Sequence, residues 1–250
     1  MTNVVVLIKQ VPDTWSERKL REDDWTLDRD SADPVLDEIN ERAVEEALLI
    51  KEKHGGEVTV LCAGPDRAAD AIRKALSMGA DKAIHINDEA LHGSDALQTS
   101  WVLAKALGTV EGVELVIAGN ESTDGRVGAV PAIIAEYLGL PQLTQMRKLE
   151  IDGDTISGER ETDDGVFGLE ATLPAIVSVN EKINEPRFLP SRASWPRRRS
   201  RLRFFHSLIL RSNQARLALQ TPHRRSPLRS RSHPRLLVRR SPTKAKAAPR

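Results

Sequence analysis

The chain has 250 residues, of which 40% are hydrophobic, and its net charge is +1. These values are typical of an ordinary soluble protein of one or two domains, and the absence of a long apolar run argues against a membrane-spanning one. The charge is unevenly divided. Residues 1–188 hold nineteen basic and all thirty-six acidic residues, a net charge of −17, whereas residues 189–250 hold eighteen basic residues and no acid. We therefore expect a folded domain over 1–188 and a separate basic tail over 189–250.

The sequence contains a single cysteine, Cys62, which excludes an internal disulfide framework. No cleavable signal is recognisable, so the sequence predicts a cytoplasmic protein. Cys62 stands at the end of an apolar strand, and no histidine is evidently paired with it. We interpret it as a small core residue rather than a catalytic thiol.

Short apolar runs alternate with helical patterns through the first 118 residues. Strands are predicted at 4–8, 57–65, 82–86 and 113–118, and helices at 37–54, 67–78 and 92–107. This alternation predicts an α/β fold: a doubly wound, mostly parallel sheet with helices on both faces, Rossmann-like, with a rim of a size that suits a nucleotide. Residues 14–36 interrupt the pattern and are polar and irregular, as in a small hairpin or a covering flap.

The stretch 114–138 gives the strongest indication of function. An apolar run too short for a helix passes through a loop of Gly, Asn, Ser, Thr and Asp into a helical pattern that begins near Val130. Such a loop, with Gly125 and Gly128, can hold a phosphate against the unpaired N–H groups of the helix start. An ordinary β–α connection would have a similar sequence, so the pattern leaves both interpretations open.

Ligands of doubly wound sheets bind beyond the carboxyl ends of the strands. Residues 7–9, 63–65 and 119–130 are therefore expected on one rim. After residue 141 the pattern changes to alternating strands around turn dipeptides, which predicts antiparallel hairpins capping the sheet, followed by a strand at 173–179.

We find no pattern that predicts a catalytic residue or a metal site. Zinc spacing, a nucleophile elbow and the dinucleotide glycine fingerprint are all missing from the sequence, and the histidines are scattered. The acid pairs Glu45-Glu46 and Asp163-Asp164 are interpreted as solvated, because adjacent acids on a helix or turn usually are.

Several stretches together resemble the beta subunits of electron transfer flavoproteins. They are residues 6–13, 43–47, 75–81, 119–125, 160–175 and 184–188. The resemblance covers about residues 4–188. It implies an α/β subunit that buries AMP and pairs with an alpha subunit carrying FAD. The heterodimer would take electrons from acyl-CoA and other dehydrogenases and pass them to a membrane quinone oxidoreductase or another acceptor.

The resemblance also implies the residues that contact AMP. By position they are Leu7, Asp37, Glu38, Ile39, Asn40, Ala63, Gly119, Asn120, Glu121, Ser122, Thr123, Asp124, Gly125, Arg126, Val127, Gly128, Ala129 and Val130. Backbone N–H groups near Gly128 to Val130 would face the phosphate. At the helix entry the family often has Asn-Pro, whereas this chain has Asp37-Glu38.

The tail departs from the family after residue 188. The codons TCA AGG GCA TCA TGG CCG CGA AGA AGA AGT encode residues 191–200. Begun one nucleotide earlier, after a T, they encode Phe-Lys-Gly-Ile-Met-Ala-Ala-Lys-Lys-Lys, the usual continuation in the family. We hypothesise that the tail is a frame-shifted translation. The hypothesis fails if the gene, read in the other frame near codon 189, does not restore that continuation.

As written, the tail's Arg, Ser and Pro bias predicts disorder. Two alternative functions stay open: a stand-alone ATP- or AMP-binding domain of the same architecture, and nonspecific, salt-sensitive binding of nucleic acid through the tail. We rank tail-mediated binding lower, since no aromatic platform or recognition helix accompanies the charge.

Overall fold

The computed structural model describes residues 1–187, 201–205 and 237–240. The strands of its central region are β1 (Val4–Ile8), β4 (Val58–Ala63), β5 (Lys82–Ile86), β6 (Leu115–Gly119), β7 (Gln142–Asp152) and β10 (Ala175–Val179). The outer strands are β8 (Thr155–Thr162), β9 (Gly165–Thr172), β11 (Arg201–Phe205) and β12 (Leu237–Arg240), and β2 (Gln10–Pro12) pairs with β3 (Pro34–Leu36) in a separate ribbon. The helices are α1 (Glu38–His54), α2 (Ala69–Met78), α3 (Ala96–Leu107) and α4 (Val130–Leu138), with short 3-10 turns η1 (Asp66–Ala68) and η2 (Glu89–Leu91).

Within these residues ten strands form one sheet in the order β11-β5-β4-β1-β6-β10-β7-β8-β9-β12. Neighbours from β11 to β7 run parallel, and neighbours from β7 to β12 run antiparallel. The predicted fold class, α/β with a mostly parallel sheet and an antiparallel addition, is confirmed.

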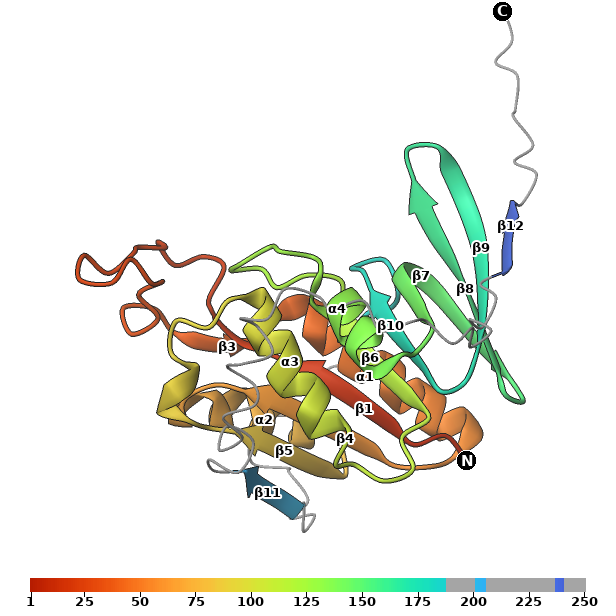
Figure 1. Cartoon of the computed structure of the whole chain (residues 1–250), viewed down its shortest axis with the longest axis horizontal. Helices are drawn as coiled ribbons and strands as arrows, with labels where there is room; N and C mark the ends of the chain where they lie inside the picture. The colour runs from red at the N-terminus through yellow and green to blue at the C-terminus, as the bar shows by residue number, and fades with distance from the viewer. Residues whose placement is uncertain (188–200, 206–236, 241–250) are drawn as a thin grey trace, which may run out of the picture.

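The helices cover both faces of the sheet because successive side chains of a buried strand point to opposite sides. Val4, Val6 and Ile8 of β1 pack with α1 and α2, whereas Val5 and Leu7 pack with α3 and α4. Figure 1 shows α3 and α4 on the near side of the sheet. All of β1 is buried, as expected of a strand at the centre of a parallel sheet.

The polypeptide winds in two directions from β1. It passes through β4 and β5 on one side, and then returns to form β6 on the other side of β1. The helix that follows β1 covers one face, and the helix that follows β6 covers the opposite face. In sheets of this kind a crevice opens between the two neighbouring strand ends, here those of β1 and β6.

The hairpins after residue 141 extend the sheet and do not cap it, so that part of the prediction is wrong. β10 lies between β6 and β7, parallel to both, and β8 and β9 continue outward from β7. In Figure 1 these strands rise at one end of the molecule. The sequence pattern gives the strands but not their neighbours, because the pairing of β10 is decided by long-range contacts.

Residues 13–33, called here the excursion, lie between the paired strands β2 and β3. A bridge between Leu20 and Leu27 makes the middle of the excursion a small hairpin. Figure 1 shows the excursion extending from the body at the end opposite to β8 and β9.

The basic tail contains two strands that the sequence did not predict, β11 beside β5 and β12 beside β9. The rest of the tail lies outside the described residues, so its disorder stays a prediction. Among the residues described, none of the helices has the length and apolar character needed to cross a bilayer.

Candidate nucleotide site

The three predicted rim segments follow neighbouring parallel strands. β1 pairs with β4 on one side and with β6 on the other, so the ends of all three strands meet at one edge of the sheet. Lys9, Gly64 and Asn120 are the first residues beyond these ends. The expectation that the segments share a rim is therefore confirmed.

Asp37 is fully buried and joins the start of α1 to the loop after β6. Its Oδ1 accepts hydrogen bonds from the N–H groups of Ile39 and Asn40 at 3.0 and 3.3 Å, which caps the helix. Its Oδ2 accepts from the N–H and the hydroxyl of Thr123 at 2.7 and 2.8 Å. One carboxylate therefore fixes two of the predicted segments against each other.

Asn40 connects the same helix to the ends of β1 and β6. Its Oδ1 accepts a hydrogen bond from the Lys9 N–H at 2.7 Å. A Cβ on Gly119 would lie 2.6 Å from Asn40 Nδ2, closer than any side chain tolerates. A side chain at 119 would therefore have to displace the Asn40 amide.

Asp124 is buried between two cations although it lies in a loop. Its side chain is 1% exposed, and its oxygens contact Lys9 Nζ at 2.8 Å and Arg29 Nη2 at 2.6 Å. Burial alone would raise the pKa of the carboxyl, but the charge and hydrogen bond of Lys9, helped by Ser122 and Arg29, hold that pKa well below its usual range. Asp124 is therefore ionised at neutral pH.

The start of α4 differs from the start of α1 because no side chain caps it. Gly128 has a φ of 67° and the next residue, Ala129, is in the right-handed helical region. Successive backbone N–H groups in such a pair form a concavity that binds anions. In the same loop, Asn120 Oδ1 is buried without a hydrogen-bond partner in the described structure. An uncapped helix start and an unpaired amide oxygen fit the phosphate and hydroxyl groups of a nucleotide.

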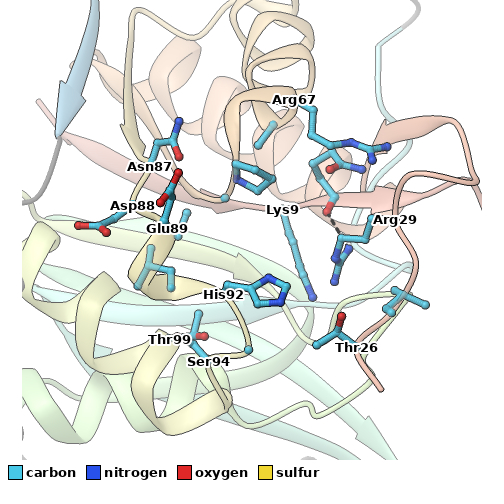
Figure 2. A pocket seen from close by; sticks show the side chains of 18 of the residues that line it. Lys9, Thr26, Arg29, Arg67, Asn87, Asp88, Glu89, His92, Ser94 and Thr99 are labelled. Atoms are coloured by element: carbon cyan, nitrogen blue, oxygen red, sulfur yellow. Dashed lines mark hydrogen bonds between the residues drawn. The ribbon is translucent and has the colours of Figure 1, made fainter. Parts of the chain in front are cut away.

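A cavity of about 840 Å³ lies beside the ends of β4 and β5. Residues 119–130 do not line it, but two of its lining residues, Lys9 and Arg29, pair with Asp124 of the loop. Its wall is apolar where it meets Ala63, Pro65 and Val102, and cationic where Lys9, Arg29 and Arg67 line it. Figure 2 shows Lys9 and Arg29 reaching into the cavity beside Thr26 and His92, with Asn87 to Glu89 on the other side. The apolar wall suits a flat base, and the cations along one edge suit its phosphate, although the carboxylates of Asp30, Asp88 and Glu89 also line the cavity.

Comparison with known proteins agrees with this architecture. The model of the electron transfer flavoprotein domain matches residues 24–200. The electron transfer flavoprotein subunit beta of Mycobacterium tuberculosis H37Rv is 75% identical over 193 residues, which cover 75% of this chain and 73% of the relative. The chain belongs to the electron transfer flavoprotein beta-subunit family.

More distant members of the family agree. The subunit beta of Clostridium acetobutylicum is 37% identical over 187 residues, covering 75% of this chain and 71% of the relative. Protein FixA of Azorhizobium caulinodans is 38% identical over 192 residues, covering 74% of this chain and 68% of the relative.

The structure brings together most, but not all, of the residues that the family resemblance suggested. Asp37, Asn40 and the loop from Gly119 to Asp124 form one connected group. Ala63 lines the cavity together with Lys9. The side chain of Leu7 instead packs into the core against α3 and α4, so its main chain is the part that reaches the rim. Contact of any of these residues with AMP stays a prediction.

Two cations of the site, Lys9 and Arg29, are missing from the AMP contacts that the resemblance implied, although Lys9 belongs to the predicted rim segment 7–9. Lys9 directly follows β1, and its position beyond a parallel strand end was a usable signal. Arg29 lies within the irregular excursion, where no periodic pattern places its side chain. Its role becomes visible only through its contact with Asp124, 95 residues further along the chain.

The interpretation of Glu45 and Glu46 as solvated is wrong, because both residues are buried. Glu45 accepts hydrogen bonds from Arg187 at 2.8 to 3.1 Å, and Glu46 accepts one from Asn184 at 3.0 Å. The pair holds the segment after β10 against α1 and lies away from the nucleotide loop. Asp163-Asp164 is exposed at the turn between β8 and β9, as expected.

Proposed function

We propose that this chain is the nucleotide-holding half of an electron carrier and is not an enzyme on its own. It binds AMP with the phosphate at the start of α4, and it forms a heterodimer with an alpha subunit that carries FAD. The observation that carries the proposal is the uncapped helix start beside the buried, unpaired Asn120 Oδ1, at the edge where β1 and β6 end. Family membership gives the electron-transfer context.

Each part of the site has a separate role in holding the nucleotide. The backbone N–H groups near Gly128 and Ala129 are placed to bind phosphate, and Asn120 supplies an acceptor for a hydroxyl or amine. Lys9 and Arg29 keep the buried charge of Asp124 neutralised, so that the loop does not repel an anion. The apolar wall at Ala63 and Pro65 offers a surface for the base.

The bound flavin of the alpha subunit would supply the redox chemistry, accepting and releasing electrons. This chain would contribute a rigid, nucleotide-stabilised partner for that subunit. Electrons would come from acyl-CoA and other dehydrogenases and pass to a membrane quinone oxidoreductase or another acceptor. The segment expected to recognise the dehydrogenases follows residue 188 and lies outside the described residues.

Co-expression of the full chain with the alpha-subunit gene tests the proposal. We expect the two chains to purify together with a flavin absorbance spectrum, and an acid extract to contain AMP close to one per heterodimer. A colourless preparation without adenine would contradict the proposal. ATP binding by the full chain without a partner would favour a stand-alone nucleotide-binding domain, and steeply salt-dependent retention on DNA would favour the tail as the functional segment.

A further inference from the structure

The buried carboxylate of Asp124 connects two parts of the chain that do not otherwise belong together. One of its cations, Lys9, follows a core strand and is fixed by the sheet. The other, Arg29, belongs to the excursion, which has few apolar contacts with the body. Arg29 also donates to the Gln10 carbonyl at 3.5 Å, a long contact that Figure 2 marks with a dashed line. Its short bond, at 2.6 Å, is to Asp124.

Further polar contacts hold the excursion over the site. Arg18 donates to the Thr123 carbonyl at 2.6 Å, directly beside Asp124. Arg67 of η1 donates to the Ala32 carbonyl and pairs with Asp30. Arg67 and Asp30 line the cavity, and the excursion supplies more of its wall through Thr26 and Leu27.

The contacts between the excursion and the body differ in strength, because some are exposed to water and others are buried. Asp30 is 66% exposed, and ion pairs at exposed positions are weak because water and salt screen them. Asp124 is 1% exposed, and its bond to Arg29 is charge-assisted and shielded from water. Trp15 and Trp25, the largest apolar side chains of the excursion, are 94% and 73% exposed and add little packing. Arg29 therefore makes the charged contact between the excursion and the nucleotide loop that is best shielded from water. The exposed Arg18–Thr123 bond supplements it, and Asp24 pairs with His92 on the other side of the cavity.

We propose that Arg29 is a positioning residue of the nucleotide site: by binding Asp124 it holds the excursion closed over the cavity and slows the release of bound nucleotide. This inference rests on the proposed function, since it assigns a role in AMP exchange. Opening requires the Arg29–Asp124 bond to break, while Lys9 remains to neutralise the carboxylate and preserve the loop. Loss of Arg29 should therefore accelerate nucleotide exchange and leave the site itself intact.

The test measures exchange of bound radiolabelled AMP against excess unlabelled AMP, using the full chain purified with its alpha subunit. We expect Arg29→Gln to increase the dissociation rate of AMP at least about tenfold, because hydrogen bonds to charged groups contribute enough for such a change. Arg29→Lys, which keeps the charge, should restore much of the slow exchange. The matched control is Arg73→Gln, which removes an exposed pair with Asp70 on α2 and should leave exchange unchanged.

Two further measurements separate closure of the excursion from general destabilisation. Trypsin should cleave Arg29→Gln faster at Arg18, Lys19 and Arg21 than it cleaves the unmodified chain. In an Asp124→Asn background, Arg29→Gln should add almost nothing to the exchange rate, because its partner is already lost. Unchanged exchange and cleavage in Arg29→Gln, in a wild-type heterodimer that binds AMP, would overturn this inference alone. A wild-type heterodimer that binds no AMP would overturn the proposed function together with it.

Discussion

Gly119 shows how a single missing side chain keeps the predicted site together. Its Cα borders the Asn40 amide, which in turn accepts the Lys9 N–H. We expect Gly119→Ala to displace Asn40, to lower the free energy of unfolding by about 1–3 kcal/mol and to reduce AMP content. Thermal unfolding and nucleotide extraction would measure the two effects.

Gly108→Ala is the matched control. Gly108 has a φ of −63° at the end of α3, and a Cβ there would lie 3.5 Å from the nearest atom, an ordinary contact. This variant should keep its AMP and be at least as stable as the unmodified chain. Equal behaviour of the two alanine variants would contradict the proposed role of the close approach at Gly119.

Asp124 should make stability depend on pH in a definite direction. Its pKa is lowered in the folded protein, so the folded state favours the ionised form. The stabilisation is fully present above the ordinary pKa of 3.8 and is lost as the pH falls through the lower folded pKa. Asp124→Asn should therefore lower the free energy of unfolding by about 2–3 kcal/mol at neutral pH, and the difference should shrink in acid. Urea unfolding at several pH values would measure it, and a difference independent of pH would contradict the assignment.

Cys62 provides a direct probe of the core. Cys62 is fully buried, and burial raises the pKa of its thiol to about 12. Because the thiolate is the reactive form, the native protein should not react with a thiol reagent at pH 8, whereas one thiol per chain should react after unfolding in guanidinium. Rapid labelling of the native protein would show that the end of β4 is open to solvent.

At the scale of elements, two adjacent acids of α1 hold the segment that follows β10. Glu45 faces a cation, whereas Glu46 faces a neutral amide. The Arg187 guanidinium neutralises Glu45 with two hydrogen bonds, and the Arg187 backbone N–H donates a third. Glu46 meets the neutral Asn184 amide. Burial raises the pKa of Glu46; the Asn184 hydrogen bond opposes this rise, and the charge of Glu45 adds to it. The two glutamates should therefore respond differently to loss of their charge.

We expect Glu45→Gln to lower the free energy of unfolding by about 2–4 kcal/mol, because the Arg187 guanidinium loses its buried counter-charge. Glu46→Gln keeps an oxygen acceptor and removes a charge that burial disfavours, so its effect at pH 7 should be neutral or slightly stabilising. The raised pKa of Glu46 stabilises the folded state at low pH, and this stabilisation is lost as the pH rises through the folded pKa. The advantage of Glu46→Gln should thus appear only above that pH. Chemical denaturation of both variants would test the contrast, which equal losses would contradict.

Local patterns were sufficient to predict most of the elements. The runs of apolar residues located β1, β5 and β6 closely, and the glycines after α1 and α2 marked where these helices end. The helix predicted from residue 92 begins at Ala96 instead, because Asp95 caps it by accepting the Gln98 N–H at 2.8 Å. An aspartate three residues before a glutamine is a recognisable signal that the helical spacing obscured.

Features that depend on distant partners were not predictable in this way. The burial of Glu45 depends on Arg187, 142 residues away, and the burial of Asp124 depends on Arg29. The rim segments could be predicted because parallel strands place their carboxyl ends at one edge, a rule that requires no knowledge of individual side-chain contacts. The side-chain network that joins the segments requires the structure.

At the scale of the whole molecule, the elements from β1 to β10 all precede the basic tail, and so does Arg187, which binds Glu45 of α1. We expect a chain that ends at residue 188 to remain folded in the presence of the alpha subunit, although it lacks β11 and β12. Those strands lie at the two edges of the sheet, beside β5 and β9. Circular dichroism and thermal unfolding of the shortened chain would test this, and an unfolded spectrum would contradict it.

The position of β10 has a consequence for biosynthesis. As the nascent polypeptide leaves the ribosome, β1 to β6 can associate early, but β7, β8 and β9 must wait until residues 175–179 emerge and insert between β6 and β7. A ribosome that stalls before that point would expose an unjoined three-stranded ribbon, a target for chaperones and proteases. Once Val179 has emerged, a change in the message further downstream no longer affects how the central sheet is completed.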